Sequence, residues 1–175
     1  MLPTFQFNRI LLLGLIGVLS YFIGFFYDLP QIGHKELFIE IRKNVNHWEI
    51  FIFLFFTNLK VGLLILLVGY ITGGIASVIL FTWNLFSLGI LISGINSSFS
   101  NPLIVIEKQI LPHAVTEILA FFIWTYLSFE GIPFMRKIVV NSEFAIELFP
   151  SPKLLIVPTG LLALSALIES FISFN

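Results

Sequence analysis

Three ionisable side chains interrupt otherwise apolar stretches of this sequence: His113, Glu117 and Glu169. An ionisable group inside a membrane is costly, so by default it faces other protein groups and marks a functional site. His113 and Glu117 are four residues apart, which places both on one face of a helix, where they can share a hydrogen bond, a proton or a metal ion. Glu169 lies near the end of the last apolar stretch, either at the depth of Glu117 or in reach of water. The three residues are therefore the candidate catalytic groups.

In a catalytic site, Glu117 would be the general base and His113 a proton shuttle, or both would be ligands of a divalent metal ion. The spacing His-x-x-x-Glu is not the His-Glu-x-x-His motif of zinc proteases. Each residue also has a structural interpretation. His113 follows Pro112 and can be a solvated residue at a helix start, and Glu117 can be a hydrogen-bond partner between helices. Asn58 and Asn84 are interpreted as helix caps or interhelical hydrogen-bond partners.

The composition indicates whether the helices that carry these residues face water or lipid. Of the 175 residues, 58% are hydrophobic and only 11% are charged, whereas soluble domains average about 45–50% and about 25%. A chain this small cannot hide that excess in its interior. The net charge of −1 offers no basic stripe for nucleic acid, and the lack of cysteine excludes disulfides and thiolate metal sites. The sequence thus predicts an all-α, polytopic membrane helix bundle.

The apolar segments predict a single integral membrane domain over residues 1–175, with about five transmembrane helices. We expect spans at about residues 10–27, 61–80, 83–95, 111–129 and 154–174. An uninterrupted helix over residues 49–81 would be about 50 Å long, against hydrocarbon about 30 Å thick, so we expect a break near Asn58. One-sided apolar spacing predicts an interfacial or re-entrant helix over about residues 36–57.

Small residues recur at the four-residue spacing that lets membrane helices pack closely. These are Gly69, Gly73 and Ser77 in the second predicted span, and Gly89 and Ser93 in the third. They predict a tight bundle. Pro112 is expected to open the fourth helix at a first-turn position, where a missing N–H does no harm.

The positively charged residues give only a weak orientation. With the predicted spans, one membrane surface carries Arg9, Arg136, Lys137 and Lys153, and the other carries Lys35, Arg42, Lys43, Lys60 and Lys108. Four against five decides nothing under the positive-inside rule. Because Arg9 abuts the first span and Arg136 closely follows the fourth, we expect a cytoplasmic N-terminus.

The polar residues also carry a resemblance to a known family. The segments TNLKVGLLILLVGYITGGIASVILFTWNLFSLGILISG, ILPHAVTEILAFF and LIESFIS resemble the stage II sporulation protein M family of bacterial and archaeal membrane proteins, over roughly residues 55–174. The family pattern falls on Asn58, Asn84, Gly89, Pro112, His113, Glu117, Ile168, Glu169 and Phe171. Leu85, Ala114 and Ile118 depart from it, which marks a divergent member.

The resemblance implies a multi-pass protein in the cell (cytoplasmic) membrane of a prokaryote. Sporulation members are implied to serve in a membrane complex with peptidoglycan hydrolases. Small divergent members resemble those that accompany circular bacteriocin production, in maturation, secretion or self-protection. The implied partners are the lipid bilayer, other membrane proteins of such a complex and a hydrophobic peptide, with a homo-oligomer as a further option and no nucleic acid.

Three functions stay open on the sequence alone. The first is a subunit or scaffold of a secretion, maturation or envelope complex. The second is an intramembrane metal-dependent peptide-processing enzyme that uses His113, Glu117 and Glu169. The third is a small transporter or channel with Glu117 and Glu169 on a polar pathway. The substitution Glu117→Gln separates a structural from a chemical role, and we expect it to preserve assembly and abolish activity.

Overall fold

The computed structural model describes residues 3–27, 46–141 and 150–173, and within these ranges every regular element is a helix. In chain order the elements are α1 (Pro3–Phe25), α3 (His47–Ile71), α4 (Ile75–Ser98), α5 (Pro102–Val105), the π-helix η2 (Ile106–Ile110), α6 (Leu111–Ser128), α7 (Gly131–Asn141), α8 (Pro152–Ile168) and the π-helix η4 (Glu169–Ser173). Five helical segments in the described ranges are long and apolar enough to cross a membrane. The predicted all-α bundle is thereby confirmed.

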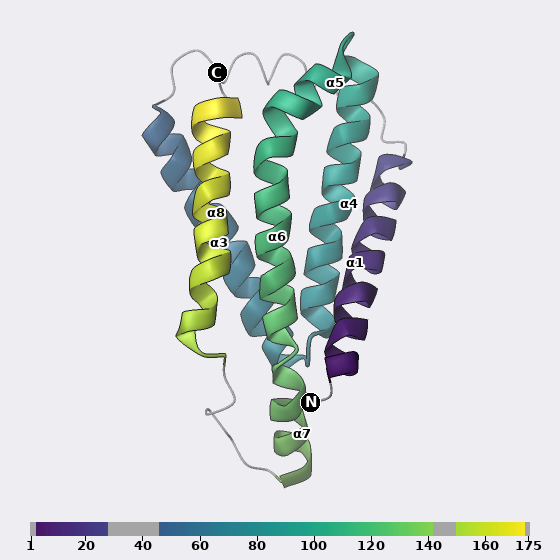
Figure 1. Ribbon diagram of the computed structural model, residues 1–175, viewed down its shortest axis with the longest axis vertical. Helices are drawn as coiled ribbons and strands as arrows, with labels where there is room; N and C mark the ends of the chain where they lie inside the picture. The colour runs from purple at the N-terminus through teal and green to yellow at the C-terminus, as the bar shows by residue number, and fades with distance from the viewer. Residues whose placement is uncertain (1–2, 28–45, 142–149, 174–175) are drawn as a thin grey trace.

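The long helices stand side by side and alternate in direction (Figure 1). α1, α4 and α8 run from the end that carries the N-terminus toward the opposite end, and α3 and α6 run back. We call the end with the N-terminus and α7 the lower end, and the end with α5 and η2 the upper end. α6 lies between α4 and α8, α3 contacts all three of these helices, and α1 packs mainly against α4.

The turn between the second and third long helices lies at residues 72–74, where the sequence does not predict one. α3 continues unbroken through Asn58, so the predicted spans at 61–80 and 83–95 have the wrong bounds. Of the predicted interfacial helix, residues 36–45 lie outside the described residues, and residues 47–57 form the first half of α3.

Two adjacent glycines make this turn. Gly73 and Gly74 have φ angles of 62° and 93°, a left-handed conformation that glycine adopts without strain. Because the segments on both sides of the glycine pair are mostly apolar, the hydropathy pattern does not indicate a turn there. Gly73 therefore lies in a turn and not on a helix-packing face, whereas Ser93, also expected on such a face, is half-buried in α4. Lys60, which the sequence places on a membrane surface, lies inside α3.

The core of the bundle lies where α3, α4, α6 and α8 meet. Two of its large side chains, Phe121 and Trp124 of α6, are each 1% exposed and pack with Ile65 of α3 and Leu162 of α8. Large apolar side chains on the outward faces of all five long helices remain exposed, as is typical of surfaces that contact lipid.

Glycine brings the helix backbones together at the edges of this core. A side chain on Gly89 of α4 would collide with the backbone of Tyr21 in α1. A side chain on Gly69 of α3 would lie 2.5 Å from Cβ of Ser77 and 2.8 Å from Cβ of Ser128. At these contacts only glycine lets the helices approach so closely, which is the packing mode that small residues provide in membranes.

Candidate functional site

Two π-helical turns, η2 and η4, pack against each other at the upper end of the bundle. In η2 the N–H of Leu111 donates to the carbonyl of Ile106, five residues earlier. Pro112 follows directly, and because it has no N–H it cannot continue the hydrogen-bond ladder of the preceding helix. η4 extends α8 and begins at Glu169. Single π-helical turns inside α-helices are frequent at functional sites, so the upper end of the bundle is the candidate functional site.

The start of α6 is tied to α8 through the backbone of His113. Oγ of Ser165, a fully buried residue of α8, donates to the His113 carbonyl at 3.0 Å. Oγ1 of Thr116 donates to the same carbonyl at 2.8 Å. The half-buried imidazole of His113 hydrogen-bonds to the backbone of Gln109 in η2. His113 therefore holds η2, α6 and α8 together.

Glu117 and Glu169 place two carboxyl groups on neighbouring helices, in α6 and at the end of α8. Glu117 lies one helical turn from His113 toward the lower end, and both glutamates are half-buried. Neither carboxyl group hydrogen-bonds to any residue in the described ranges. Two carboxylates in apolar surroundings repel each other unless a proton or a cation comes between them.

The candidate residues do not assemble into a metal centre. Within residues 3–27, 46–141 and 150–173, no three His, Cys, Asp or Glu side chains lie close enough to hold a metal ion. A catalytic zinc site uses three protein ligands and an open position. The predicted ligand pair His113 and Glu117 thus finds no third ligand in the described part of the chain.

The positions of Asn58 and Asn84 do not match the roles that the sequence predicts for them. Asn58 lies in the interior of α3, so it caps no helix. Nδ2 of Asn84 donates to the carbonyl of Leu80, one turn earlier in α4, at 2.8 Å. This bond lies within a single helix and holds no other helix in place.

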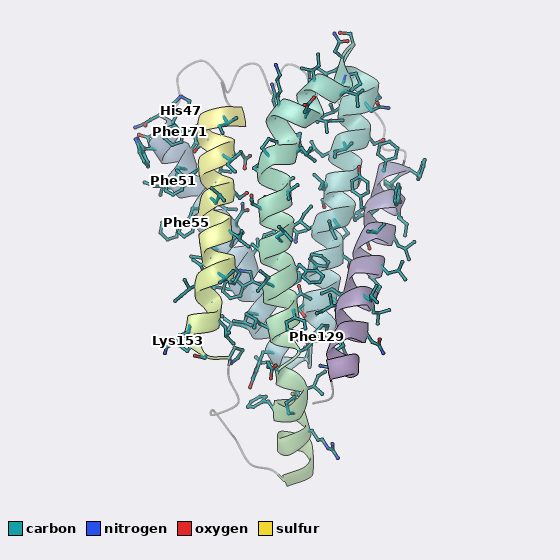
Figure 2. All side chains as sticks on the ribbon, in the orientation of Figure 1. His47, Phe51, Phe55, Phe129, Lys153 and Phe171 are labelled. Carbon is teal, nitrogen blue, oxygen red and sulfur yellow. The ribbon has the colours of Figure 1, made fainter. Side chains whose placement is uncertain are left out.

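A second polar contact at the upper end has no clear signal in the sequence. Nδ1 of His47, the first residue of α3, and the carbonyl oxygen of Ser170 in η4 are 2.6 Å apart. The His47 ring stacks on Phe171 with 5.4 Å between the ring centroids, and the edge of Trp48 meets the same ring at 5.1 Å. Figure 2 shows His47 and Phe171 together at the upper end, with Phe51 further along α3.

The partners His47 and Ser170 are 123 residues apart, so no local periodicity reveals their contact. The one local signal is a helix start at Asn46, whose Oδ1 accepts a hydrogen bond from the N–H of Trp48 at 3.1 Å. Asn46 and Glu49 have the types and spacing of a helix N-terminus.

At the lower end, a buried serine pair joins α4 to α6. The two Oγ atoms of Ser77 and Ser128 are 2.5 Å apart, and both residues are completely buried. Each hydroxyl has one proton, so one serine donates to the other, and the accepting serine donates to a nearby carbonyl, that of Gly74 for Ser77 or that of Thr125 for Ser128. Every polar atom of the pair is therefore satisfied inside the bundle, as burial in lipid requires.

Five long apolar helices whose polar side chains meet inside the bundle define a multi-pass membrane protein of the all-α class. The family model for stage II sporulation protein M matches residues 10–174, nearly the entire chain. The chain therefore belongs to the stage II sporulation protein M family. No curated protein and no solved structure matches the chain.

Proposed function

We propose that this chain is an integral membrane subunit of a multiprotein complex that acts in the maturation or secretion of a peptide such as a bacteriocin, or in remodelling of the cell envelope. The complex would lie in the cytoplasmic membrane of a prokaryote. The observation that carries the proposal is that serine and histidine residues join helices through hydrogen bonds, while Glu117 and Glu169 do not.

The hydrogen bonds between helices support a role as a rigid subunit. They occur at both ends of the bundle: Ser165 with His113 and His47 with Ser170 at the upper end, and the serine pair at the lower end. Such contacts fix one geometry among helices that lipid alone would not drive together. A fixed bundle with apolar outward faces suits a protein that other membrane proteins must recognise.

The carboxyl pair supports a chemical role for this subunit within its complex. A carboxyl group at membrane depth is tolerated when it is neutral, paired or wet. Because Glu117 and Glu169 make no hydrogen bond in the described ranges, the role that we infer for them is proton or cation handling. This role also keeps a transporter or channel as the second candidate, with the two carboxyl groups on its polar pathway.

A metal-dependent peptidase is the less favoured alternative. It requires a set of ligands, and the described residues include no group of three. The carboxyl pair still permits acid–base chemistry on a bound peptide, with Glu117 as the base.

A deletion experiment tests the proposal. The gene is removed from its own host and restored as wild type or as Glu117→Gln, and the host's secreted peptides and envelope composition are compared. We expect loss of one mature secreted peptide, or an altered envelope, on deletion, with recovery by the wild-type gene only. A deletion strain indistinguishable from its parent in both measurements would contradict the proposal.

A further inference from the structure

Lys60 lies in the middle of a membrane-crossing segment. It follows the first residue of α3, His47, by thirteen positions and precedes the last, Ile71, by eleven. With a rise of 1.5 Å per residue, the two ends of the helix are roughly 20 Å and roughly 16 Å away. The four-carbon stem of a lysine is much shorter than either distance, so the ammonium group cannot reach the water at either surface along the helix.

The side chain of Lys60 lies on the outward face of α3. The buried face of the helix is made by Gly62, Ile65, Leu66, Gly69 and Tyr70, through which α3 packs against its neighbours. Lys60 is exposed and shares the opposite face with exposed apolar residues: Phe53, Phe56, Leu63, Leu64 and Leu67. The outward face is thus an apolar surface with one positive charge near its centre.

Among the residues that the structure describes, no carboxyl group forms an ion pair with Lys60. A lysine at the bilayer centre is costly, and such residues ordinarily pair with another charge. The outward face of α3 is therefore complementary to a surface that brings a negative charge to the same depth.

We propose that a transmembrane helix of a different membrane protein docks on the outward face of α3 and pairs an aspartate or glutamate near its own midpoint with Lys60. The inference rests on the proposed function, since it names the chemistry by which the subunit recognises its partner. Apolar residues on either side of Lys60 pack against the partner helix, and the ion pair fixes its depth and orientation.

A second copy of this chain is a poor occupant of the face. The exposed carboxyl groups in the described ranges are those of Glu49, Glu107 and Glu130, and each lies near an end of the bundle. Glu117 and Glu169 are half-buried. The described residues of a neighbouring copy in the same orientation would therefore present no exposed carboxylate at the depth of Lys60.

A designed peptide tests the pairing directly. The chain has no cysteine, so a single Ser100→Cys change at the exposed upper end carries a fluorophore. The labelled protein is reconstituted in phosphatidylcholine vesicles with a quencher-labelled Leu/Ala transmembrane peptide that has Asp or Leu at its centre. We expect the Asp peptide to bind about tenfold more tightly than the Leu peptide, as an interhelical polar contact of ~1.4 kcal/mol predicts.

Three variants assign this preference to Lys60. Lys60→Leu should bind both peptides equally, and it should fold well because it removes a charge from an apolar face. Lys60→Arg should keep the preference, and so should Lys108→Leu, a matched control in η2 outside the apolar face. Equal binding of both peptides by the wild type, or a preference that survives in Lys60→Leu, would overturn the proposal.

The state of the protein in its native membrane separates this inference from the proposed function. A chain that assembles with other proteins but does not distinguish the two peptides would leave the proposed function in place and refute the pairing at Lys60. A chain that is found alone in its native membrane would instead contradict the proposed function.

Discussion

Gly89 offers the sharpest test of how the bundle is packed. A Cβ atom placed on Gly89 would collide with the carbonyl oxygen of Tyr21 and lie 2.7 Å from the backbone nitrogen of Phe25. Both neighbours are backbone atoms of α1, so they cannot rotate away as the end of a flexible side chain can. The substitution Gly89→Ala must therefore push α1 away from α4, its main packing partner.

The expected magnitude follows from two opposing effects. Overpacking a close contact costs about 1–3 kcal/mol. Alanine recovers up to about 1 kcal/mol through its higher helix propensity. We therefore expect Gly89→Ala to lower the free energy of unfolding by about 1–2 kcal/mol.

Gly94 supplies a matched control in the same helix. A Cβ atom at Gly94 meets nothing within 4 Å, so Gly94→Ala should be neutral or stabilise the helix by up to about 1 kcal/mol. The assay is reversible unfolding in mixed micelles with increasing dodecyl sulfate, followed by circular dichroism. Equal stability of the Gly89→Ala and Gly94→Ala proteins would refute the packing argument.

Three further predictions concern the polar contacts. Glu117→Gln should fold and assemble like the wild type but fail to restore activity in the deletion strain, and full complementation would return Glu117 to a structural role. Ser128→Val should lower the free energy of unfolding by about 1–3 kcal/mol, since it leaves Ser77 buried with fewer partners; an unchanged unfolding midpoint would contradict this. His47→Phe keeps an aromatic ring against Phe171 but removes the hydrogen bond to Ser170, so amide exchange should quicken in η4 and stay unchanged at the lower end.

Much of the fold is predictable from the sequence because lipid imposes a simple rule on it. A segment that crosses a bilayer must be long, apolar and helical, and the composition and segment lengths show this directly. Prolines mark two helix starts well: Pro112 and Pro152 occupy first-turn positions of α6 and α8. Glu117 and Glu169 stand out because a charge in an apolar stretch is rare.

The turn at residues 72–74 is not predicted, because a sequence made for lipid can reverse direction without a polar residue. Hydropathy registers where polar residues interrupt an apolar stretch, and so it favours a break near Asn58 and Lys60. The chain instead reverses at Gly73 and Gly74, which are as compatible with lipid as their neighbours. The turn depends on the ability of glycine to adopt positive φ angles, and the periodicity of apolar residues does not reveal that ability.

The hydrogen bonds between helices join residues that are far apart in the sequence, so no local sequence pattern predicts them. Ser77 and Ser128 are 51 residues apart, and Ser165 bonds to a carbonyl 52 residues away. Serine is common in membrane helices and carries no individual signal of such a bond. The role of His113 in holding η2 likewise follows from the π-helical turn beside Pro112, which the sequence predicts only as a helix start.

The composition of the particle that holds this chain in its own membrane tests the central claim most directly. The tagged chain can be extracted with its surrounding lipid in polymer nanodiscs, without detergent, and its proteins weighed by native mass spectrometry. We predict a particle that contains this chain and at least one different membrane protein in a fixed ratio, with that protein lost or reduced in the Lys60→Leu variant. A particle that contains only this chain would contradict the account.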